Sequence, residues 1–138
     1  MPATTLTKNN VLNYNFGSQG YSPSLPSTMY FGLSTTLVGP TGLATTTEPL
    51  TASGYARVSY LNNTDKWTTS TVGSLSNKIA ISFAQSSVAW GTILGVFIAD
   101  SGTRATGNVI WYHNIDPSII VQTLTIVTFA IGAIIVTM

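Results

Sequence analysis

Cysteine is absent from this 138-residue chain, and histidine occurs once, at position 113. A chain without cysteine forms no disulfide and offers no thiolate nucleophile. A structural zinc ion usually takes four Cys or His ligands and a catalytic zinc ion about three protein ligands, which a single His does not supply. The sequence therefore predicts no zinc site.

Charge is scarce as well. Five Lys or Arg and four Asp or Glu make up 7% of the residues, against about 25% in an ordinary soluble protein. The formal net charge is +1, and the cations are scattered at Lys8, Arg57, Lys66, Lys78 and Arg104. Because nucleic-acid binding needs clustered cations that neutralise several phosphates, this pattern predicts that the protein does not bind nucleic acid.

The groups that could support catalysis show no recognisable arrangement. His113 and Asp116 are close in sequence, but a nucleophile mechanism also needs an activated Ser or Thr beside them. The acids Glu48, Asp65, Asp100 and Asp116 each lie in a predicted loop or turn, where we interpret them as solvated or turn-forming residues. Their spacing is not typical of a calcium loop, and GPTG at 39–42 lacks the Lys of a phosphate loop. We expect no enzyme activity, no cofactor and no metal site.

Polar uncharged residues are abundant, with 22 Thr, 15 Ser and 12 Gly, while 44% of the residues are hydrophobic. This apolar content favours a packed core over disorder. Apolar or alternating segments, typical of strands, are separated by Gly, Ser, Thr and Asn clusters and occupy 27–34, 54–61, 78–84, 90–99, 107–113, 121–129 and 133–138. About seven short strands without helical periodicity predict an all-β fold, a compact antiparallel β-sandwich or barrel of jelly-roll-like type.

Residues 1–26 differ from the rest, because Asn, Gly and Pro recur among them. Such a composition favours irregular, extended backbone without a useful length of helix or strand. The segment nevertheless carries Tyr14, Phe16 and Tyr21, which are apolar anchors for a surface. We therefore predict an extended N-terminal arm over 1–26 that clamps a neighbouring molecule, followed by a β-sandwich domain over 27–138. The N-terminus lacks the apolar run of a secretory signal, so we expect synthesis in the cytoplasm.

The last 20 residues, 119–138, are long and apolar enough to span a membrane. Their β-branched Ile, Val and Thr residues favour strands, and Gly132 fits a bend between two of them. Neither end carries the Lys or Arg that commonly flanks a membrane span. We predict two core strands here and no membrane association.

Several segments together resemble a known family. They are YFGLSTT at 30–36, TEPLTASGYARV at 47–58, KIAISF at 78–83, WGTILGVFIADSGTRATGNVIWY at 90–112 and TFAIGAIIV at 128–136. In this order they resemble a group of virion proteins of tailed bacteriophages, whose members are labelled head decoration, minor capsid or tail-fibre proteins. The resemblance covers the chain from about residue 28 to the C-terminus, and it implies a β-sandwich structural subunit of a virion.

From this resemblance and the surplus of apolar residues, we expect a head decoration, or cement, protein on the capsid exterior. Its expected partners are the major capsid protein and further copies of itself, as a homotrimer. Tyr14, Phe16, Tyr21 and Trp67 are the expected contact residues. A tail or tail-fibre subunit is the first alternative. A carbohydrate-binding module that uses Trp67, Trp90 or Trp111 is the second.

Overall fold

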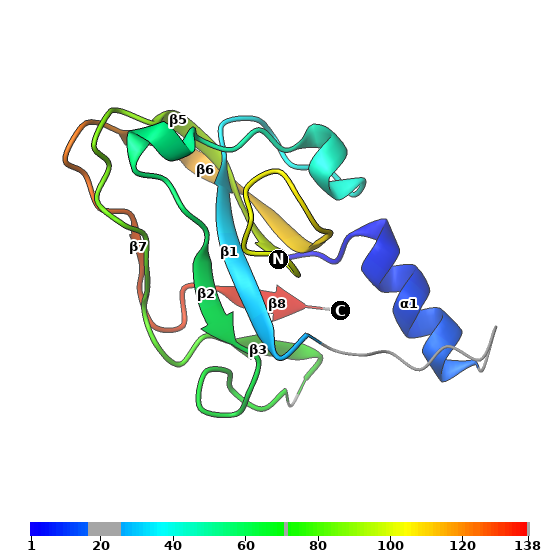
Figure 1. Ribbon diagram of the computed structural model, residues 1–138. Helices are drawn as coiled ribbons and strands as arrows, with labels where there is room; N and C mark the ends of the chain where they lie inside the picture. Colours follow the sequence, from blue (N-terminus) through cyan, green and yellow to red (C-terminus); the bar gives the residue numbers. More distant parts are fainter. Residues whose placement is uncertain (17–25, 71, 138) are drawn as a thin grey trace.

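A computed structural model describes residues 1–16, 26–70 and 72–137 of the chain (Figure 1). Its helix α1 spans Thr5–Asn15. The strands are β1 (Thr28–Ser34), β2 (Val58–Leu61), β3 (Ser74–Ser76), β4 (Ile81–Ser82), β5 (Gly91–Ala99), β6 (Val109–Val121), β7 (Thr128–Phe129) and β8 (Ile135–Thr137). Two 3-10 turns, η2 (Gly42–Thr45) and η3 (Thr51–Ser53), lie in the long loop after β1.

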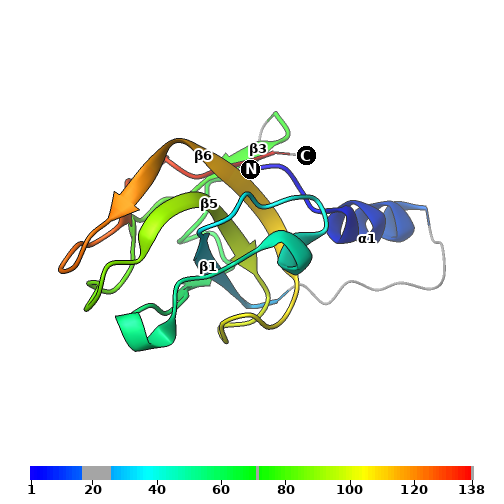
Figure 2. The ribbon, with the colours of Figure 1, turned by 90° about the horizontal axis from the view of Figure 1, so that it is seen from above.

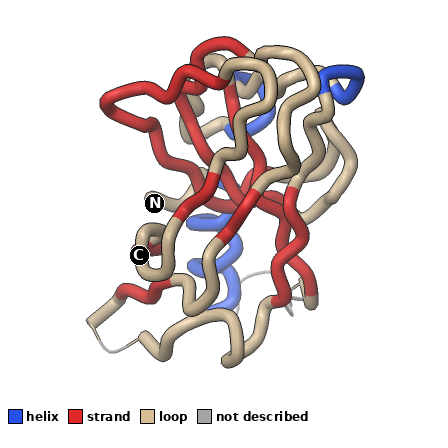
Figure 3. The backbone as a smooth tube through the Cα atoms, turned by 90° about the vertical axis from the view of Figure 1, so that its left-hand side faces the viewer, coloured by secondary structure: helices blue, strands red, loops and turns tan. Residues whose placement is uncertain are grey.

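The strands form one larger antiparallel sheet and two small ribbons. The sheet has the order β2-β1-β5-β6, while β3 pairs with β8 and β4 pairs with β7. Buried side chains of the sheet, such as Phe31 and Ile93, share one core cluster with Ile81, Val127 and Val136 from the region of the ribbons. The ribbons therefore cover one face of the sheet as a second layer (Figure 3). The predicted compact all-β fold is confirmed.

Strand β5 is the centre of the molecule and is buried on both faces. Ile93, Val96 and Ile98 belong to the main core, whereas Phe97 and Ala99 join Val109 in a smaller cluster. A Cβ atom on Gly32, which pairs with Phe97, would come within 2.2 Å of the Phe97 ring. Only a glycine fits at this close approach, so the aromatic ring of β5 lies directly on the backbone of β1.

Several predicted strands are shorter or longer than expected. Residues 54–57 precede β2 as irregular backbone, and β4 is only two residues long. The predicted turn at Asp116-Pro117 is wrong, because β6 continues to Val121 with a large bulge, between the pairs Gly95↔Asn114 and Ile93↔Ile119. A bulge takes up extra residues of one strand, and pairing resumes beyond it. An Asp-Pro dipeptide can occur in such a bulge as well as in a turn that reverses the chain, so the sequence alone does not distinguish the two.

The apolar C-terminal stretch forms strand and loop rather than a helix. It contains the end of β6, then β7 and β8, so the prediction of strands in place of a membrane helix agrees with the structure. Residues 122–127, which were predicted as part of a strand, form a loop. Val121, Val127, Ile134 and Val136 are buried there. None of the helices in the described ranges combines the length and the hydropathy needed to cross a membrane.

Helix α1 corrects the expectation that residues 1–26 are extended. The Thr4 side chain caps the helix by accepting from the Thr7 amide at 3.5 Å, and Lys8 N–H donates to the Thr4 carbonyl at 3.0 Å. Asn residues lower helix stability by only a fraction of a kcal/mol each, which a good N-cap and tertiary anchoring offset. Before the helix, Ala3 pairs with Trp111 of β6, and Thr4 is buried. The described part of the arm is thus docked at its beginning, and the division at residue 26 stays a prediction.

The loop between β5 and β6 holds Ala105 in a left-handed conformation, with φ of 58°. This conformation costs a residue with a Cβ roughly 1–2 kcal/mol, and Ala105 is exposed, so its methyl group contributes little packing. We expect Ala105→Gly to raise the free energy of unfolding by about 0.5–1 kcal/mol in urea titrations. The exposed Ala89, whose φ is not positive, is the control: Ala89→Gly should lower stability by about 0.5–1 kcal/mol. Equal losses in both variants would contradict strain at Ala105.

Candidate functional site

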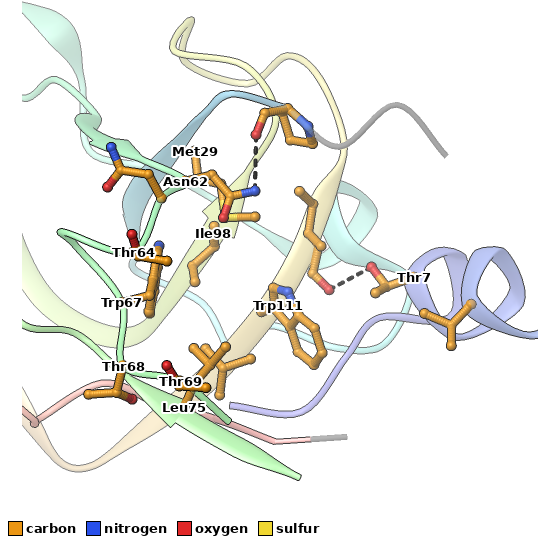
Figure 4. Close-up of a pocket in the computed structure, with 15 residues that line it drawn as sticks. Thr7, Met29, Asn62, Thr64, Trp67, Thr68, Thr69, Leu75, Ile98 and Trp111 are labelled. Atoms are coloured by element: carbon orange, nitrogen blue, oxygen red, sulfur yellow. Dashed lines mark hydrogen bonds between the residues drawn. The ribbon is translucent and has the colours of Figure 1, made fainter. Parts of the chain in front are cut away.

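An apolar groove lies between helix α1, the first residues of β6 and the loop that follows β2 (Figure 4). We call it the α1 groove. Its volume is about 530 Å³, which is within the range of small-molecule pockets. The residues that line it are Thr7, Val11, Pro26, Met29, Asn62, Asn63, Thr64, Trp67, Thr68, Thr69, Leu75, Ile98, Ile110, Trp111 and Val136. None of them carries a charge.

Two tryptophans from different parts of the chain line this groove. Trp67 comes from the loop after β2 and is 7% exposed; its ring packs edge-on against Tyr60 with centroids 5.2 Å apart. Trp111 is on β6 and is half-buried, beside Ala3 with which it forms a bridge. The floor includes Met29 of β1 and Ile98 of β5, so the rigid sheet carries the groove.

The indole N–H of Trp67 is an unusual feature of the core beside the groove. Nε1 is buried and has no hydrogen-bond partner among the described residues. Figure 4 shows this ring edge-on, with its nitrogen on the side of Thr64. By contrast, the buried indole N–H of Trp90 donates to the Ser53 carbonyl at 2.9 Å. Since a buried donor without an acceptor costs about 1–3 kcal/mol, the Trp67 N–H needs an explanation.

Helix α1 forms the outer wall of the groove and is fastened to β6 at its first turn. The Thr4 hydroxyl donates to the Val109 carbonyl at 2.8 Å, and the Thr7 hydroxyl donates to the Ile110 carbonyl at 2.9 Å. Thr4 N–H donates to the same Ile110 carbonyl at 2.9 Å. From this attachment the helix points away from the body, as Figures 1 and 2 show. Its last turn is therefore free of the sheet.

The predicted contact residues have separate positions. Tyr14 is 58% exposed and Phe16 is 81% exposed, at the end of α1 that points away from the body. Tyr21 lies outside the described residues. Trp67 differs from Tyr14 and Phe16, because it belongs to the main core and lines the α1 groove. The sequence did not distinguish this buried tryptophan from the exposed aromatic residues. Exposed aromatic side chains at the end of a helix can contact another molecule, which leaves these residues as candidates.

The three tryptophans considered for carbohydrate binding do not lie on one surface. Trp90 is buried, and its ring packs edge-on against Tyr55 with centroids 5.4 Å apart. Trp67 is buried beside Phe31 and Tyr60. Trp111 alone among them is half-buried. A stacking platform for a sugar needs exposed ring faces, so burial of Trp67 and Trp90 removes two of the three predicted platform residues.

The candidate catalytic groups are spread over the molecule. His113 and Asp116 are both exposed on β6, and within the described ranges no hydrogen bond or ion pair joins them. Asp100 accepts from the Asn108 amide at 2.7 Å, and Asp65 is an exposed loop residue, as the turn interpretation predicted. In the same ranges no group of three His, Cys, Asp or Glu residues lies close enough together to hold a metal ion.

Glu48 was interpreted as a solvated loop residue, and this is wrong, because it is only 4% exposed. Its two carboxylate oxygens accept from Arg57 Nε and Nη2, both at 2.9 Å. Tyr55 donates its phenol O–H to Glu48 at 2.7 Å, and the Ala105 amide donates at 2.7 Å. Arg57 also donates to the Ser101 carbonyl at 2.6 Å, so the pair joins the loop before β2 to the loop between β5 and β6. We call this set of side chains the Glu48 network.

The network explains the protonation of its own members. Burial alone would raise the pKa of Glu48, but hydrogen bonds from Arg57, the Ala105 amide and Tyr55, with the attraction of Arg57, lower that pKa below its ordinary value. Burial first, and the negative charge of Glu48 second, raise the pKa of the Tyr55 phenol. Glu48 is therefore ionised and Tyr55 protonated at neutral pH. Glu48, Tyr55 and Arg57 all lie in the segment TEPLTASGYARV at 47–58. This segment thus supplies the side chains of the Glu48 network, which the sequence did not reveal.

An apolar groove and exposed aromatic residues on a β-scaffold are features of a domain that makes contacts with other molecules.

The family whose sequence model matches residues 2–137 is described as podophage GP4 fiber I protein gp80. The chain belongs to this family and is thus a structural protein of a tailed-phage virion. The resemblance seen in the sequence is confirmed, and the match also includes the N-terminal region that lay outside it. No curated protein matches the chain.

Proposed function

We propose that the protein is a subunit of a tail fibre of a podophage virion, in which it acts by contacts with neighbouring protein chains. The match of the fibre family to residues 2–137, almost the whole chain, carries the proposal. This description supports the tail-fibre alternative better than a head decoration protein. The all-β scaffold and the uncharged apolar groove are compatible with a permanent structural role.

The proposed partners are other chains of the fibre, including further copies of this protein. Exposed Tyr14 and Phe16 at the end of α1 that points away from the body support contacts of this kind. The free energy falls when a neighbouring chain covers aromatic rings that are otherwise in contact with water. Binding of the major capsid protein and formation of a homotrimer were expected for a head decoration protein, and both stay predictions.

Imaging of the intact virion tests the location. We expect gold-labelled antibodies, or density in a particle reconstruction that fits this domain, at the tail. Label spread over the outer surface of the head instead would contradict the fibre proposal and support a decoration protein. Purified heads without tails, probed with the same antibody, are the control for non-specific labelling.

The aromatic end of α1 gives a separate prediction. Tyr14→Ser with Phe16→Ser should change the free energy of unfolding by no more than about 0.5 kcal/mol, because both rings are mostly exposed. Incorporation of the double variant into virions, measured by complementation and quantitative blotting, should fall. Val72→Ser, which removes an equally exposed apolar side chain elsewhere, should be incorporated normally. Normal incorporation of the double variant would show that the rings make no contact in the virion.

A further inference from the structure

We propose that a pocket around Arg104 binds an acidic segment of a different virion protein, with a carboxylate on the Arg104 guanidinium and a neighbouring apolar side chain against Leu50 and Val88. The proposal rests on the proposed function, because it names the chemistry of a partner that a structural subunit of a virion would take. It concerns a site separate from the α1 groove and from the aromatic end of α1.

The pocket, which we call the Arg104 pocket, lies where three parts of the chain meet. Its walls come from the loop between β1 and β2, the residues just before β5 and the loop between β5 and β6. Its volume is about 360 Å³, which is within the range of ligand pockets. Glu48 and Arg104 are the charged residues that line it, and Leu50, Val88 and Trp90 give it apolar surface. The pocket thus combines charge with apolar surface, which the α1 groove does not.

The guanidinium group of Arg104 is held in one orientation. Its Nε donates to the Pro49 carbonyl and its Nη2 to the Glu48 carbonyl, both at 2.7 Å. These two bonds use one edge of the planar group. Within the described ranges, Nη1 and the second N–H of Nη2 have no acceptor, and Arg104 is only half-buried. A parallel pair of N–H groups therefore remains for a ligand, in the arrangement that binds the two oxygens of a carboxylate.

The positive charge of Arg104 has no carboxylate partner in the part of the chain that the structure describes. The one ion pair there joins Arg57 to Glu48. Both of these side chains are buried and their charges compensate each other, so Glu48 does not neutralise Arg104. Asp100 lies in the same loop as Arg104, but its two oxygens accept from the amide and the side chain of Asn108. A half-buried cation without a counter-ion attracts an anion, and a carboxylate matches its single charge.

The guanidinium and the apolar wall lie at opposite ends of one short segment, 48–53. Arg104 is bonded to the first two carbonyls of this segment. Trp90 donates its indole N–H to the last carbonyl, that of Ser53, at 2.9 Å. Leu50 lies between these two attachments in sequence and is exposed. A ligand that fills the pocket therefore meets a charge at one end and apolar side chains toward the other.

This combination favours a peptide over an acidic sugar or a phosphate. In a peptide, Glu or Asp can stand next to an apolar residue, whose side chain would cover the exposed Leu50 and Val88 and gain free energy by burial. A sugar acid would bring hydroxyl groups against the same aliphatic side chains, where each unpaired hydroxyl is costly. A phosphate group, with a charge of about −1.5 to −2 at neutral pH, would exceed the single charge of Arg104.

The exposed carboxylates of this chain fit the pocket poorly, so we assign the partner to a different protein. Asp65 is followed by Lys66, whose charge would oppose that of Arg104. Asp116 follows Ile115, whose side chain packs against the core of its own domain and is not free to enter a neighbour.

Nuclear magnetic resonance of the ¹⁵N-labelled full chain tests the proposal through the arginine Nε–H signals. Arg57 and Arg104 are the two arginines of the chain, so each gives one readily assigned signal. The probe is the capped peptide Ala-Glu-Leu, and its match is Ala-Gln-Leu, which has the same shape without the charge. The Glu peptide should shift the Arg104 signal with an affinity in the millimolar range, and the Gln peptide should bind about tenfold more weakly. The Arg57 signal should not move, because its Nε–H is bonded to buried Glu48.

Variants of Arg104, followed through the backbone amide signal of Leu50, separate the charge from the geometry. Arg104→Lys keeps the positive charge but loses the parallel N–H pair, so it should weaken binding of the Glu peptide about threefold. Arg104→Gln removes the charge and should lower the affinity for the Glu peptide to that for the Gln peptide. Lys78→Gln, which removes an exposed cation elsewhere, should leave both affinities unchanged. If Arg104→Gln unfolds the chain, the comparison of the two peptides on the unmodified protein still decides.

Three results would overturn the proposal. One is equal binding of the Glu and Gln peptides, or no shift of the Arg104 signal by either peptide in the millimolar range. Another is an equal or larger shift with glucuronic acid or inorganic phosphate, which would make the pocket a site for a sugar acid or a phosphate. The third is an Arg104 shift that follows protein concentration alone, with matching self-association in sedimentation, which would assign the pocket to a second copy. All these measurements use isolated protein, so their failure leaves the location on the virion, and thus the proposed function, a separate question.

Discussion

Replacement of Glu48 by Gln is expected to lower the free energy of unfolding by about 3–5 kcal/mol. The substitution keeps the size of the side chain but removes the negative charge that faces Arg57, whose side chain is fully buried. A buried guanidinium without its partner loses the attraction that offsets its desolvation. Because this loss approaches the total stability of many domains, about 5–15 kcal/mol, a marginal fold would be largely unfolded. Urea titration followed by circular dichroism measures the change.

Matched controls separate the charge from the packing. The double variant Glu48→Leu with Arg57→Met removes both charges and should lose less stability than Glu48→Gln, because it leaves no unpaired charge in the interior. Asp65→Asn removes an exposed carboxylate and should stay within about 0.5 kcal/mol of the unmodified protein. A Glu48→Gln variant as stable as Asp65→Asn would show that the network contributes nothing to the fold.

The same network predicts how stability changes with pH. In the folded protein the pKa of Glu48 is lowered, so ionised Glu48 stabilises the fold fully above its unfolded-state pKa of about 4.3. This contribution is lost as the pH falls through the lower pKa of the folded state. The difference in melting temperature between the unmodified protein and Glu48→Gln should therefore be constant near neutral pH and shrink in acid below about pH 4. A difference that grows in acid would contradict the lowered pKa.

The sequence predicted best those strands that are buried on both faces or end at strong turns. Segment 90–99 reads as one apolar run, and β5 occupies nearly the same residues, because a central strand needs apolar side chains in both directions. Segment 27–34 likewise becomes β1. Of the short strands, β3 was missed, whereas β4, β7 and β8 occupy only parts of the predicted segments 78–84, 121–129 and 133–138. Their positions depend on pairing with residues far along the chain, which local patterns do not contain.

Helix α1 and the Glu48 network show a second limit of local patterns. The Asn-rich segment around Lys8 reads as irregular, yet Thr4 and Thr7 bind carbonyls of β6 more than a hundred residues away and hold the helix in place. Glu48 reads as a surface acid because nothing near it in sequence indicates burial. Its partner Arg57 follows nine residues later, and the Ala105 amide comes from the loop between β5 and β6. Only the fold brings these groups together.

The α1 groove has the same origin. Thr7, Trp67 and Trp111 come from three distant parts of the chain, so no motif could have predicted the groove as a unit. Trp67 was expected at a contact, and it lies at the groove wall, but its burial in the core could not be read from the polar loop around it. Alternation of polar and apolar residues identifies the faces of a strand and gives no such information for a loop.

Truncation of the chain after Ser118 is expected to abolish cooperative folding. The lost residues include Val121, Val127, Ile134 and Val136, which are buried in the main core. Each such side chain contributes about 1.5–3 kcal/mol by burial, so the four together are comparable with the whole stability of a domain. Asn77 would also lose two hydrogen bonds of its side chain, which accepts from the Ile134 amide at 2.9 Å and donates to the Ala130 carbonyl at 3.0 Å.

Two point variants test the same segment without removing it. Ile134 is buried, so Ile134→Ala should lower the free energy of unfolding by about 2–5 kcal/mol. Ile131 lies three residues earlier and is exposed, so Ile131→Ala should change it by no more than about 0.5 kcal/mol. A truncated chain that stays soluble and melts cooperatively near the temperature of the full chain would show that the core does not need the C-terminal segment. Equal effects of the two point variants would lead to the same conclusion, because burial in the core is what distinguishes their side chains.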